Sequence, residues 1–405
     1  MKQQIKKSSI EWKEVVLSEF AKCLNGFAFK SEKFNDEKKG IPLIRIRNLF
    51  NGKSETYYSG EYVKEYLVNQ GDFLIGMDGE FKIFEWKSEK ALLNQRVSKL
   101  LFDKEKITPK YIFYLINQKL KEIEDKTPFV TVKHISSKQI ESIKIPLPFR
   151  NGHPDLETQK QIVSILEKAE QLKEKRKQAI KLLDEYVKSV FNEMFGDPSI
   201  NPKKWSIKTI QEVALDKKGS IRMGPFGSQL KKHELVTEGV KVLWIENIVG
   251  NKFNPGGTKY ITEEKYEQLK GFTINKGNLL ITMMGTIGRV EIVPDIGKAI
   301  ISSHLLKIEV NNKICDPIYL KKIIMSPFVQ NQFKDASHGA IMSGLNGGII
   351  KSTKIPLPPL PLQQTFASIV EHVEKLKEKQ NKSLQEIEQL FNALMQKAFN
   401  GELVK

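Results

Sequence analysis

The chain has 405 residues, of which 40% are hydrophobic, and a formal net charge of +17. This length predicts roughly two to four domains, each large enough to bury its own core. The positive surplus favours a polyanionic partner, which could be nucleic acid, an acidic protein or an anionic membrane face. No apolar run is long enough for a membrane span, and no secretory signal is recognisable at the N-terminus.

Residues from about 11 to 148 are predicted to form a unit of mixed helices and strands. Residues 41–46 alternate and are rich in branched side chains, which is typical of a strand. Residues 72–75 follow a turn glycine and predict a short buried strand. Residues 109–121 begin with proline and predict a helix, because proline is tolerated in the first helical turn.

A long helix is predicted from about residue 158 to residue 195. Its apolar residues recur at three-and-four spacing, and Asp155 precedes it as a plausible cap. Gly196 ends the pattern and Pro198 lies just beyond, which is the usual chemistry of a helix C-terminus.

The second half of the chain repeats the first. Ile-Pro-Leu-Pro stands at residues 145–148 and again at 355–358, and each half opens with a tryptophan segment, at Trp12 and at Trp205. The repeat is too long for a solenoid unit, so we interpret it as a duplicated domain. The loops between matching blocks differ in length, which predicts one scaffold that presents two different binding surfaces.

A second long helix is predicted from about residue 363 to residue 399, with Gly401 ending it. A helix of nearly forty residues is on the order of 55 Å long and needs a partner for its apolar stripe. Equal length and equal position in the repeat favour pairing of the two helices over separate docking on the domains. A stiff spacer is expected, because flexible linkers are rich in Gly and Ser. The predicted pairing residues are Ile165, Leu172, Leu183, Val190, Ile369, Leu376, Ile387 and Leu394.

The predicted fold class is therefore α+β: two similar domains of mixed helices and strands, separated by two long antiparallel coiled-coil helices in an internal pseudo-two-fold repeat. The predicted boundaries are 1–150 for the first domain, 151–199 for the first spacer helix, 200–360 for the second domain and 361–405 for the second spacer helix.

Common catalytic patterns are missing from the sequence. The Gly-Lys-Ser at residues 52–54 lacks the upstream glycine of a phosphate-binding loop, since Arg47 stands there. The histidines lack metal-ligand spacing. Cys23 and Cys315 have no metal or redox spacing, so the expected location is a reducing cytoplasm. A binding or scaffolding role without a metal is predicted.

The ordered set of motifs resembles the specificity subunits of type I restriction-modification systems. Each long helix follows an Ile-Pro-Leu-Pro segment and has a glutamine in its first turn, Gln159 or Gln161 in one case and Gln363 in the other. The resemblance covers nearly the whole chain, from about Trp12 to Gly401. The segments that carry it are 26–31, 44–48, 93–96, 195–197, 224–228 and 245–247. One departure is Ser302-Ser303-His304, where the first half has Asn94-Gln95-Arg96.

The resemblance implies a DNA-recognition subunit that does no chemistry. Each globular domain would recognise one half of a bipartite duplex DNA site, and the helices would set the spacing. Two modification subunits, which use S-adenosylmethionine to methylate adenine, would dock on the helices, and two restriction subunits could join them. The chain itself needs no cofactor under this interpretation.

Side chains that could contact DNA are predicted from their types. Arginine suits guanine, Asn or Gln suits adenine, and lysine suits phosphate. The candidates in the first half are Lys30, Arg45, Arg47, Gln95, Arg96, Lys133 and His134. Those in the second half are Arg222, Ser228, Lys231, Lys232, Asn247, Arg289 and His304.

Three alternatives stay open at the level of sequence. The chain could be an enzyme with an unfamiliar site, which activity of the isolated chain would reveal. It could be the recognition component of another multi-subunit or fused restriction or methylation enzyme. It could also be a coiled-coil adaptor for an acidic protein, which salt-sensitive binding to duplex DNA would rule out.

Overall fold

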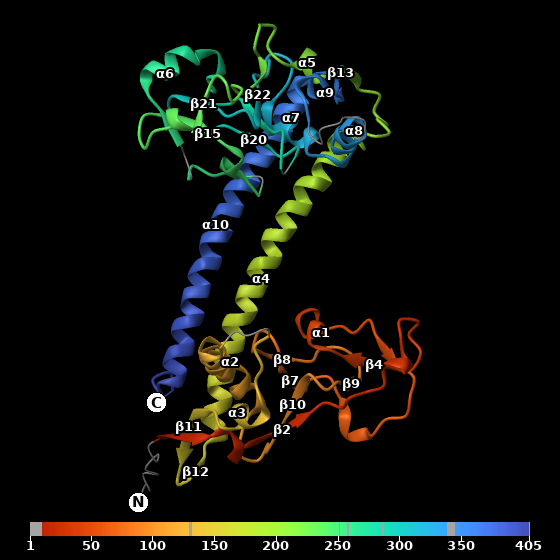
Figure 1. Cartoon of the computed structure of the whole chain (residues 1–405), viewed down its shortest axis with the longest axis vertical. Coiled ribbons are helices and arrows are strands. Elements are labelled where there is room, and N and C mark those ends of the chain that lie inside the picture. Colours follow the sequence, from red (N-terminus) through yellow and green to blue (C-terminus); the bar gives the residue numbers. More distant parts are fainter. Residues whose placement is uncertain are drawn as a thin grey trace, which may run out of the picture. The chain divides into compact units, whose positions relative to one another are not determined.

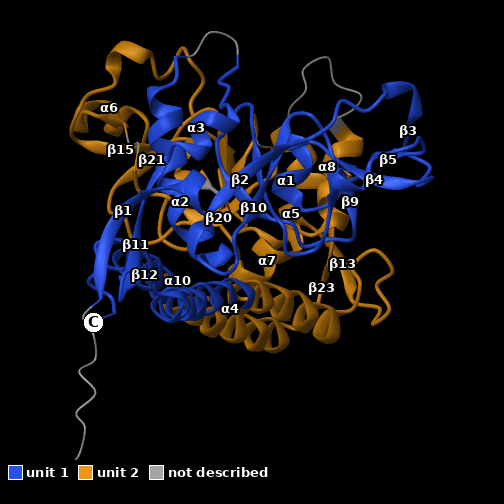
Figure 2. Cartoon of the chain, turned by 90° about the horizontal axis from the view of Figure 1, so that it is seen from below, with its two compact units in different colours: residues 1–178, 382–405 blue, residues 179–381 orange. Residues whose placement is uncertain are grey.

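The computed structural model describes residues 10–128, 132–250, 252–256, 259–285, 287–337 and 345–404. The chain divides into two compact units, which Figure 2 colours separately. Unit 1 comprises residues 1–178 and 382–405, and unit 2 comprises residues 179–381. The division falls inside both long helices, so each helix contributes to both hydrophobic cores.

The described strands of unit 1 form three sheets, in the orders β1-β11-β12, β2-β10-β7-β8 and β3-β5-β4-β9-β6. Helices α2 and α3 pack beside the second of these. The strands are β1 (Glu11–Val16), β2 (Ala21–Asn25), β3 (Phe34–Asn35), β4 (Ile41–Ile44), β5 (Tyr57–Tyr58), β6 (Leu67–Val68), β7 (Phe73–Gly76), β8 (Ile83–Glu85), β9 (Ala91–Leu93), β10 (Val97–Phe102), β11 (Lys144–Arg150) and β12 (His153–Pro154). The shorter helices are α1 (Ile46–Asn51), α2 (Pro109–Lys126) and α3 (Ser137–Glu141).

Unit 2 repeats this plan, with the sheet orders β13-β23, β14-β22-β19-β20 and β18-β15-β21, and a small β16-β17 pair, among its described residues. The strands are β13 (Ser206–Thr209), β14 (Ile221–Met223), β15 (Val240–Leu243), β16 (Ile248–Val249), β17 (Lys252–Phe253), β18 (Lys259–Ile261), β19 (Leu279–Thr282), β20 (Val290–Ile292), β21 (Ala299–Ile301), β22 (Leu305–Ile308) and β23 (Lys354–Leu357). The helices are α5 (Ile210–Val213), α6 (Glu263–Gln268), α7 (Pro317–Ile324), α8 (Pro327–Ser337) and α9 (Gly347–Ser352).

Within each unit, the segment that follows or contains the repeated tryptophan pairs as a strand with the Ile-Pro-Leu-Pro segment. In unit 1 the tryptophan strand β1 runs antiparallel to the Ile-Pro-Leu-Pro strand β11, with Trp12 opposite Pro148. In unit 2 strand β13 pairs in the same way with β23, with Ser206 opposite Leu357. The tyrosine hydroxyls of Tyr111 and Tyr319 donate to the carbonyls of Pro146 and Pro356, over 2.7 and 2.6 Å. Each pair therefore fixes the start of a long helix against its domain.

The long helices are α4 (Leu156–Phe195) and α10 (Leu360–Phe399), and both extend through the predicted ranges (Figure 1). Asp155 caps α4 as predicted, because its Oδ1 accepts from the amides of Glu157 and Thr158. Gly196 has φ +80 at the C-terminal end, a conformation that glycine adopts without steric cost.

Glutamine in the first turn of each long helix has a structural role. The Oε1 atom of Gln159 accepts from the amide of Thr108 over 2.8 Å, and that of Gln363 accepts from the amide of Asp316 over 2.8 Å. Both side chains are buried, whereas Gln161 is exposed. The equivalent of Gln363 is therefore Gln159, and each residue ties its long helix to the loop before α2 or α7.

Contacts within each unit establish that α4 and α10 pair antiparallel. In unit 2 the rings of Phe195 and Phe366 lie 5.3 Å apart, and Lys377 forms a 2.7 Å ion pair with Asp184. In unit 1 the ammonium of Lys173 lies 5.0 Å from the ring centre of Phe391. Residues late in one helix thus meet residues early in the other.

Seven of the eight predicted pairing residues are at least partly buried. Leu172 is the exception, with 55% of its surface exposed, so the prediction for Leu172 is corrected. Its side chain lies on the solvent side of the helix, while Leu166 is buried in the unit 1 core and Ala169 is also buried. The buried or partly buried residues are Ile165, Leu183, Val190, Ile369, Leu376, Ile387 and Leu394.

The predicted strand at residues 41–46 is shorter than expected. Strand β4 ends at Ile44, and helix α1 begins at Ile46. The reason is the side chain of Asn48, whose Oδ1 accepts from the amide of Arg45 over 2.9 Å and turns the chain into the helix.

Candidate nucleic-acid interface

Three segments that are distant in the sequence meet in unit 1. The amide of Met77 donates to the carbonyl of Arg96 over 3.0 Å, and the amide of Ile135 donates to the carbonyl of Met77 over 2.9 Å. Gly26 packs on the same turn, because a Cβ there would lie 2.1 Å from the Asn94 carbonyl oxygen. These bonds bring together the turn after β9, the end of β7 and the segment before α3. The side chains of the three segments therefore lie close to one another.

The side chains that meet there are Asp78, Arg96 and His134. One carboxylate oxygen of Asp78 lies 2.6 Å from Nδ1 of His134, and the other lies 3.4 Å from Nη1 of Arg96. Arg96 and His134 remain about half exposed, while Asp78 is more buried beneath them. Two of the predicted DNA-contact residues are thus brought together by an acidic residue that the sequence analysis did not single out.

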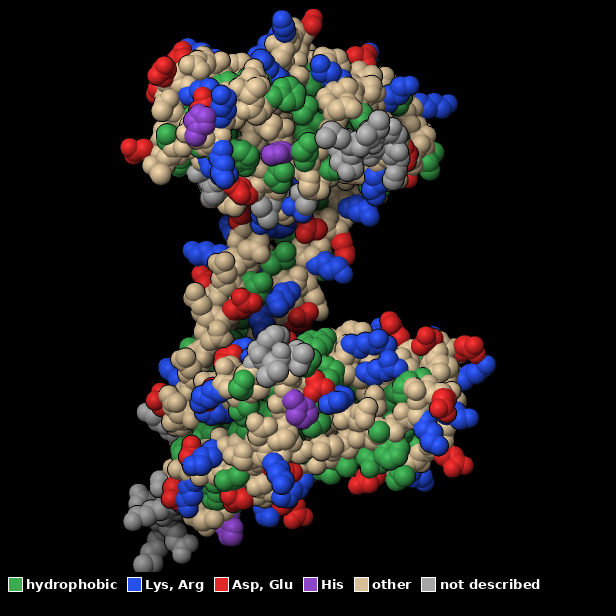
Figure 3. Space-filling view, viewed as in Figure 1, with side chains coloured by type: hydrophobic (Ala, Val, Ile, Leu, Met, Phe, Trp, Pro, Cys, Tyr) green, Lys and Arg blue, Asp and Glu red, His purple; other side chains and the backbone are tan. Residues whose placement is uncertain are grey.

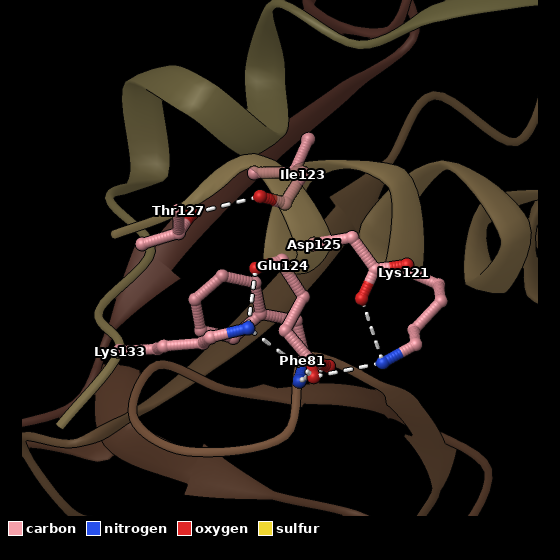
Figure 4. A network of polar contacts seen from close by, with 7 residues as sticks. All are labelled: Phe81, Lys121, Ile123, Glu124, Asp125, Thr127 and Lys133. Atoms are coloured by element: carbon pink, nitrogen blue, oxygen red, sulfur yellow. Dashed lines mark hydrogen bonds and ion pairs between the residues drawn. The ribbon is translucent and has the colours of Figure 1, made fainter. Parts of the chain in front are cut away.

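Lys133 is held by an internal contact. Its ammonium donates to the carbonyl of Glu124 over 2.7 Å, as Figure 4 shows, and lies 3.9 Å from a carboxylate oxygen of the same residue. The other carboxylate oxygen of Glu124 accepts from the amide of Phe81 over 3.1 Å. A lysine at the last turn of a helix satisfies a free carbonyl and the helix dipole. Lys133 therefore anchors the segment that carries His134.

The remaining candidates of unit 1 lie between β2 and β3, just after β4 and in the turn after β9. The guanidinium of Arg45 lies 5.0 Å from the ring centre of Phe34, and Nη2 of Arg47 donates to Oγ1 of Thr56 over 3.4 Å. Lys30 and Gln95 are exposed. These side chains are accessible in part, but described contacts do not join them to the Asp78 cluster.

Unit 2 has a related turn with different chemistry. The amide of Met283 donates to the carbonyl of His304 over 2.9 Å, which makes His304 the equivalent of Arg96. The ring of His304 lies 5.9 Å from that of Trp244, and the ammonium of Lys259 lies 4.2 Å from the Trp244 ring. The sequence analysis missed Trp244 and Lys259. Alignment of the two halves could have identified Trp244 as a candidate, because it occupies the position of Arg45.

Asn247 is corrected from a base-contact candidate to a structural residue. It is fully buried, and its Oδ1 accepts from the amide of Trp244 over 2.7 Å. Its Nδ2 donates to the carbonyls of Asn254 and Gly256. The side chain stabilises the turn after β15, as Asn48 does after β4, and its burial keeps it out of reach of a base.

The other candidates of unit 2 are more accessible. Ser228, Lys231 and Lys232 are exposed on the segment between β14 and β15, and Arg289 is half-buried. The guanidinium of Arg222 lies 4.0 Å from the ring centre of Phe272 and donates to the carbonyl of Gly271 over 3.3 Å. Arg222 therefore stacks on its own unit, which orients it but restricts its reach.

Positive side chains are spread over the face of the molecule drawn in Figure 3. On the face drawn in Figure 3, Lys and Arg side chains lie among Asp and Glu side chains in both units instead of forming one uninterrupted patch. Local clusters, rather than the net charge alone, therefore decide where a phosphate backbone would bind.

The described residues include no group of three or more His, Cys, Asp and Glu side chains that could hold a metal ion. Burial raises the pKa of the Cys23 thiol to about 12, so this thiol stays protonated at neutral pH. In the described part of the chain, no helix combines the length and apolar character needed to cross a bilayer.

A family model described as type I restriction modification DNA specificity domain matches the chain twice, at residues 9–182 and 202–389. These matches cover most of the sequence. The chain belongs to this family. It carries two target-recognition domains of a type I specificity subunit, whose part in such systems is DNA recognition without catalysis.

Relatives align with almost the full length of this specificity subunit. The Type I restriction enzyme EcoBI specificity subunit of Escherichia coli is 28% identical and aligns over 97% of this chain and 86% of its own. The MjaVIII specificity subunit of Methanocaldococcus jannaschii is 23% identical, with 97% and 93% covered.

Solved structures share its fold. The S subunit of a type I system from M. genitalium superposes with a TM-score of 0.59 at 14% identity and covers 98% of both chains. A chain from a structural study of type I complex assembly and conformational transition gives a TM-score of 0.55 at 16% identity, with 97% of this chain and 98% of that chain covered.

Proposed function

We propose that each unit of this specificity subunit recognises one half of a bipartite duplex DNA site, with two modification subunits bound to the paired helices. The target-recognition domains would comprise residues 1–150 and 200–360, and the spacer helices residues 151–199 and 361–405. The observation that carries the proposal is the repeat itself: two equivalent scaffolds with equivalent hydrogen bonds present different exposed side chains.

In the first domain, the main contact surface would be the Asp78 cluster. Arg96 offers a fork of donors that matches guanine O6 and N7, and His134 lies beside it on the same carboxylate. Lys30, Arg45, Arg47 and Gln95 would supply further base or phosphate contacts around this cluster.

In the second domain, the equivalent surface would be built around His304, with Trp244 and Lys259 beside it. Ser228, Lys231, Lys232 and Arg289 would contribute phosphate or base contacts, and Arg222 would act from its stacked position. The different side chains predict that the two half-sites have different sequences.

The paired helices would set the distance between half-sites. Adding one turn to both α4 and α10 lengthens each by about 5.4 Å. Since neighbouring base pairs are about 3.4 Å apart, the preferred spacer should widen by one or two base pairs. An unchanged spacer would contradict this role of the helices.

The test of domain assignment uses the complex with its modification subunits. The target is first obtained by mapping methylated adenines in the source genome with and without the gene. Arg96→Ala should then weaken binding by roughly 1–3 kcal/mol and relax one position in one half-site. Lys144→Ala is the matched control, because Lys144 is an exposed cation that also pairs with a carboxylate, Glu14, over 3.5 Å.

Two results would contradict the assignment. If Arg96→Ala weakened all duplexes equally, Arg96 would be a phosphate contact and not a base contact. If Arg96→Ala and Lys144→Ala behaved alike in binding and in salt dependence, the Asp78 cluster would not be a DNA-contact surface.

Two restriction subunits could join the complex, and a cytoplasmic location is expected for such an assembly.

A further inference from the structure

Asp78 is the one acidic residue that touches both Arg96 and His134 among the described contacts. It lies two residues beyond the end of β7, and its side chain is 21% exposed, against 59% for Arg96 and 49% for His134. An acidic residue here lowers the attraction of the surface for phosphate. The presence of Asp78 on this surface therefore has to be explained by a role other than raising the general affinity for DNA.

The hydrogen bond to Asp78 fixes the chemistry of His134. An ionised carboxylate only accepts, so in the hydrogen bond between them Nδ1–H of His134 donates and Oδ1 of Asp78 accepts. In the neutral ring this leaves Nε2 as an acceptor. Arg96 has donors only. With the ring neutral, Asp78 thus places the Nε2 acceptor of His134 beside the donor fork of Arg96, a combination that can distinguish base pairs in the major groove.

The main chain around Asp78 is also fixed. Asp78 and His134 form an isolated antiparallel bridge, and the amide of Gly79 donates to the carbonyl of Lys133 over 2.9 Å. Lys133 is in turn tied to α2 through Glu124. These bonds fix the main chain that carries the Asp78 carboxylate. A residue that orients its neighbours needs such a fixed position.

Among its described residues, unit 2 has no such arrangement. Its equivalent turn has Met284 after Met283 where unit 1 has Asp78 after Met77, and Met284 is 47% exposed. The residue equivalent to Arg96 is His304, which packs near Trp244 instead of a carboxylate. The second domain is therefore an internal control for any effect of Asp78.

We propose that Asp78 is a positioning residue that sets the base preference of the first target-recognition domain by orienting Arg96 and His134 as a donor–acceptor pair. The inference rests on the proposed function of this surface. It predicts opposite effects on two quantities: removing the charge of Asp78 lowers discrimination in one half-site, while binding to non-target DNA stays equal or becomes tighter.

The experiment measures binding of the complex with modification subunits to duplexes that carry single base-pair changes in either half-site, over a series of salt concentrations. Asp78→Asn should reduce discrimination about tenfold at one or two positions of a single half-site. Discrimination at the other half-site should not change. Binding to a duplex without the target should be unchanged or up to several-fold tighter.

Further variants separate the possible outcomes. Asp78→Ser repeats the test with a smaller side chain, and thermal unfolding of both variants checks that the domain is intact. Met284→Lys adds charge at the equivalent position of unit 2 and should change only general affinity. Equal loss at both half-sites, or unchanged discrimination in Asp78→Asn and Asp78→Ser, would overturn the role of Asp78.

Failure of the inference and failure of the proposed function give different results. If Arg96→Ala and His134→Ala relax one half-site while Asp78→Asn does not, the surface binds DNA but Asp78 does not position it. If Arg96→Ala and His134→Ala also leave every position unchanged, the surface does not recognise bases, and both proposals fall.

Discussion

The two units share the hydrogen bonds that face inward and differ in the side chains that face outward. Gln159 and Gln363 accept equivalent bonds through Oε1, as Asn48 and Asn247 do through Oδ1 at their turns. The position of Asp78 in one unit is that of Met284 in the other. A duplicated fold can therefore keep its internal contacts while its binding chemistry diverges, because exposed side chains contribute little to folding.

The sharpest test of the shared frame is at the close approach between Gly224, which follows β14, and Ser302, which follows β21. A Cβ on Gly224 would lie 2.1 Å from the carbonyl oxygen of Ser302. Gly224→Ala should lower the free energy of unfolding by about 3 kcal/mol, since backbone atoms would have to move. Urea titration measures this effect.

Gly227→Ala is the matched control for Gly224→Ala, because nothing lies within 4 Å of a Cβ at Gly227. Gly26→Ala should behave like Gly224→Ala, because its Cβ would lie 2.1 Å from the Asn94 carbonyl oxygen. A difference of more than about 1 kcal/mol between Gly26→Ala and Gly224→Ala would contradict the equivalence of the two units.

The first-turn glutamines test the same equivalence at a polar site. Gln363→Ala should lower the free energy of unfolding by about 2 kcal/mol, because the amide of Asp316 and the carbonyl of Ile314 lose their partner. Gln159→Ala should give a similar loss in unit 1. Gln161→Ala, at an exposed position, should have little effect when the three variants are compared by urea titration.

The helix pair offers a contrast between a buried and an exposed apolar residue. Val190 is 8% exposed and Leu172 is 55% exposed. Val190→Ala should lower the free energy of unfolding by about 1.5 kcal/mol, and Leu172→Ala by less than about 0.5 kcal/mol. If circular dichroism during thermal unfolding gave equal losses, the helix face assigned to the pair would be wrong.

The smallest expected effect concerns the cap of α4. Burial acts to raise the pKa of Asp155, but hydrogen bonds from Arg150 and Thr158 outweigh it and hold this pKa below its ordinary value. Asp155→Ala should cost about 1 kcal/mol at neutral pH. Because the folded pKa is depressed, this contribution exists above the unfolded pKa of about 3.9 and is lost as pH falls. The difference between wild type and variant should therefore disappear in acid.

Much of the architecture follows from the sequence. The three-and-four spacing of apolar residues predicted both long helices nearly to their ends, with Asp155 and Gly196 as the end signals of the first and Gly401 as that of the second. The duplication predicted two similar domains, and the family resemblance predicted their role. These features are local or repeated, so periodicity and capping chemistry suffice to detect them.

The candidate site was predicted less completely. Residue type identified Arg96 and His134 as able to bind bases, but residue type also selected Asn247, which is buried, and Lys133, which binds Glu124. Only tertiary structure decided that Asp78 lies between two residues 18 and 56 positions away along the chain. Contacts across such separations depend on how strands cross and turns close, and no local pattern of residues records that.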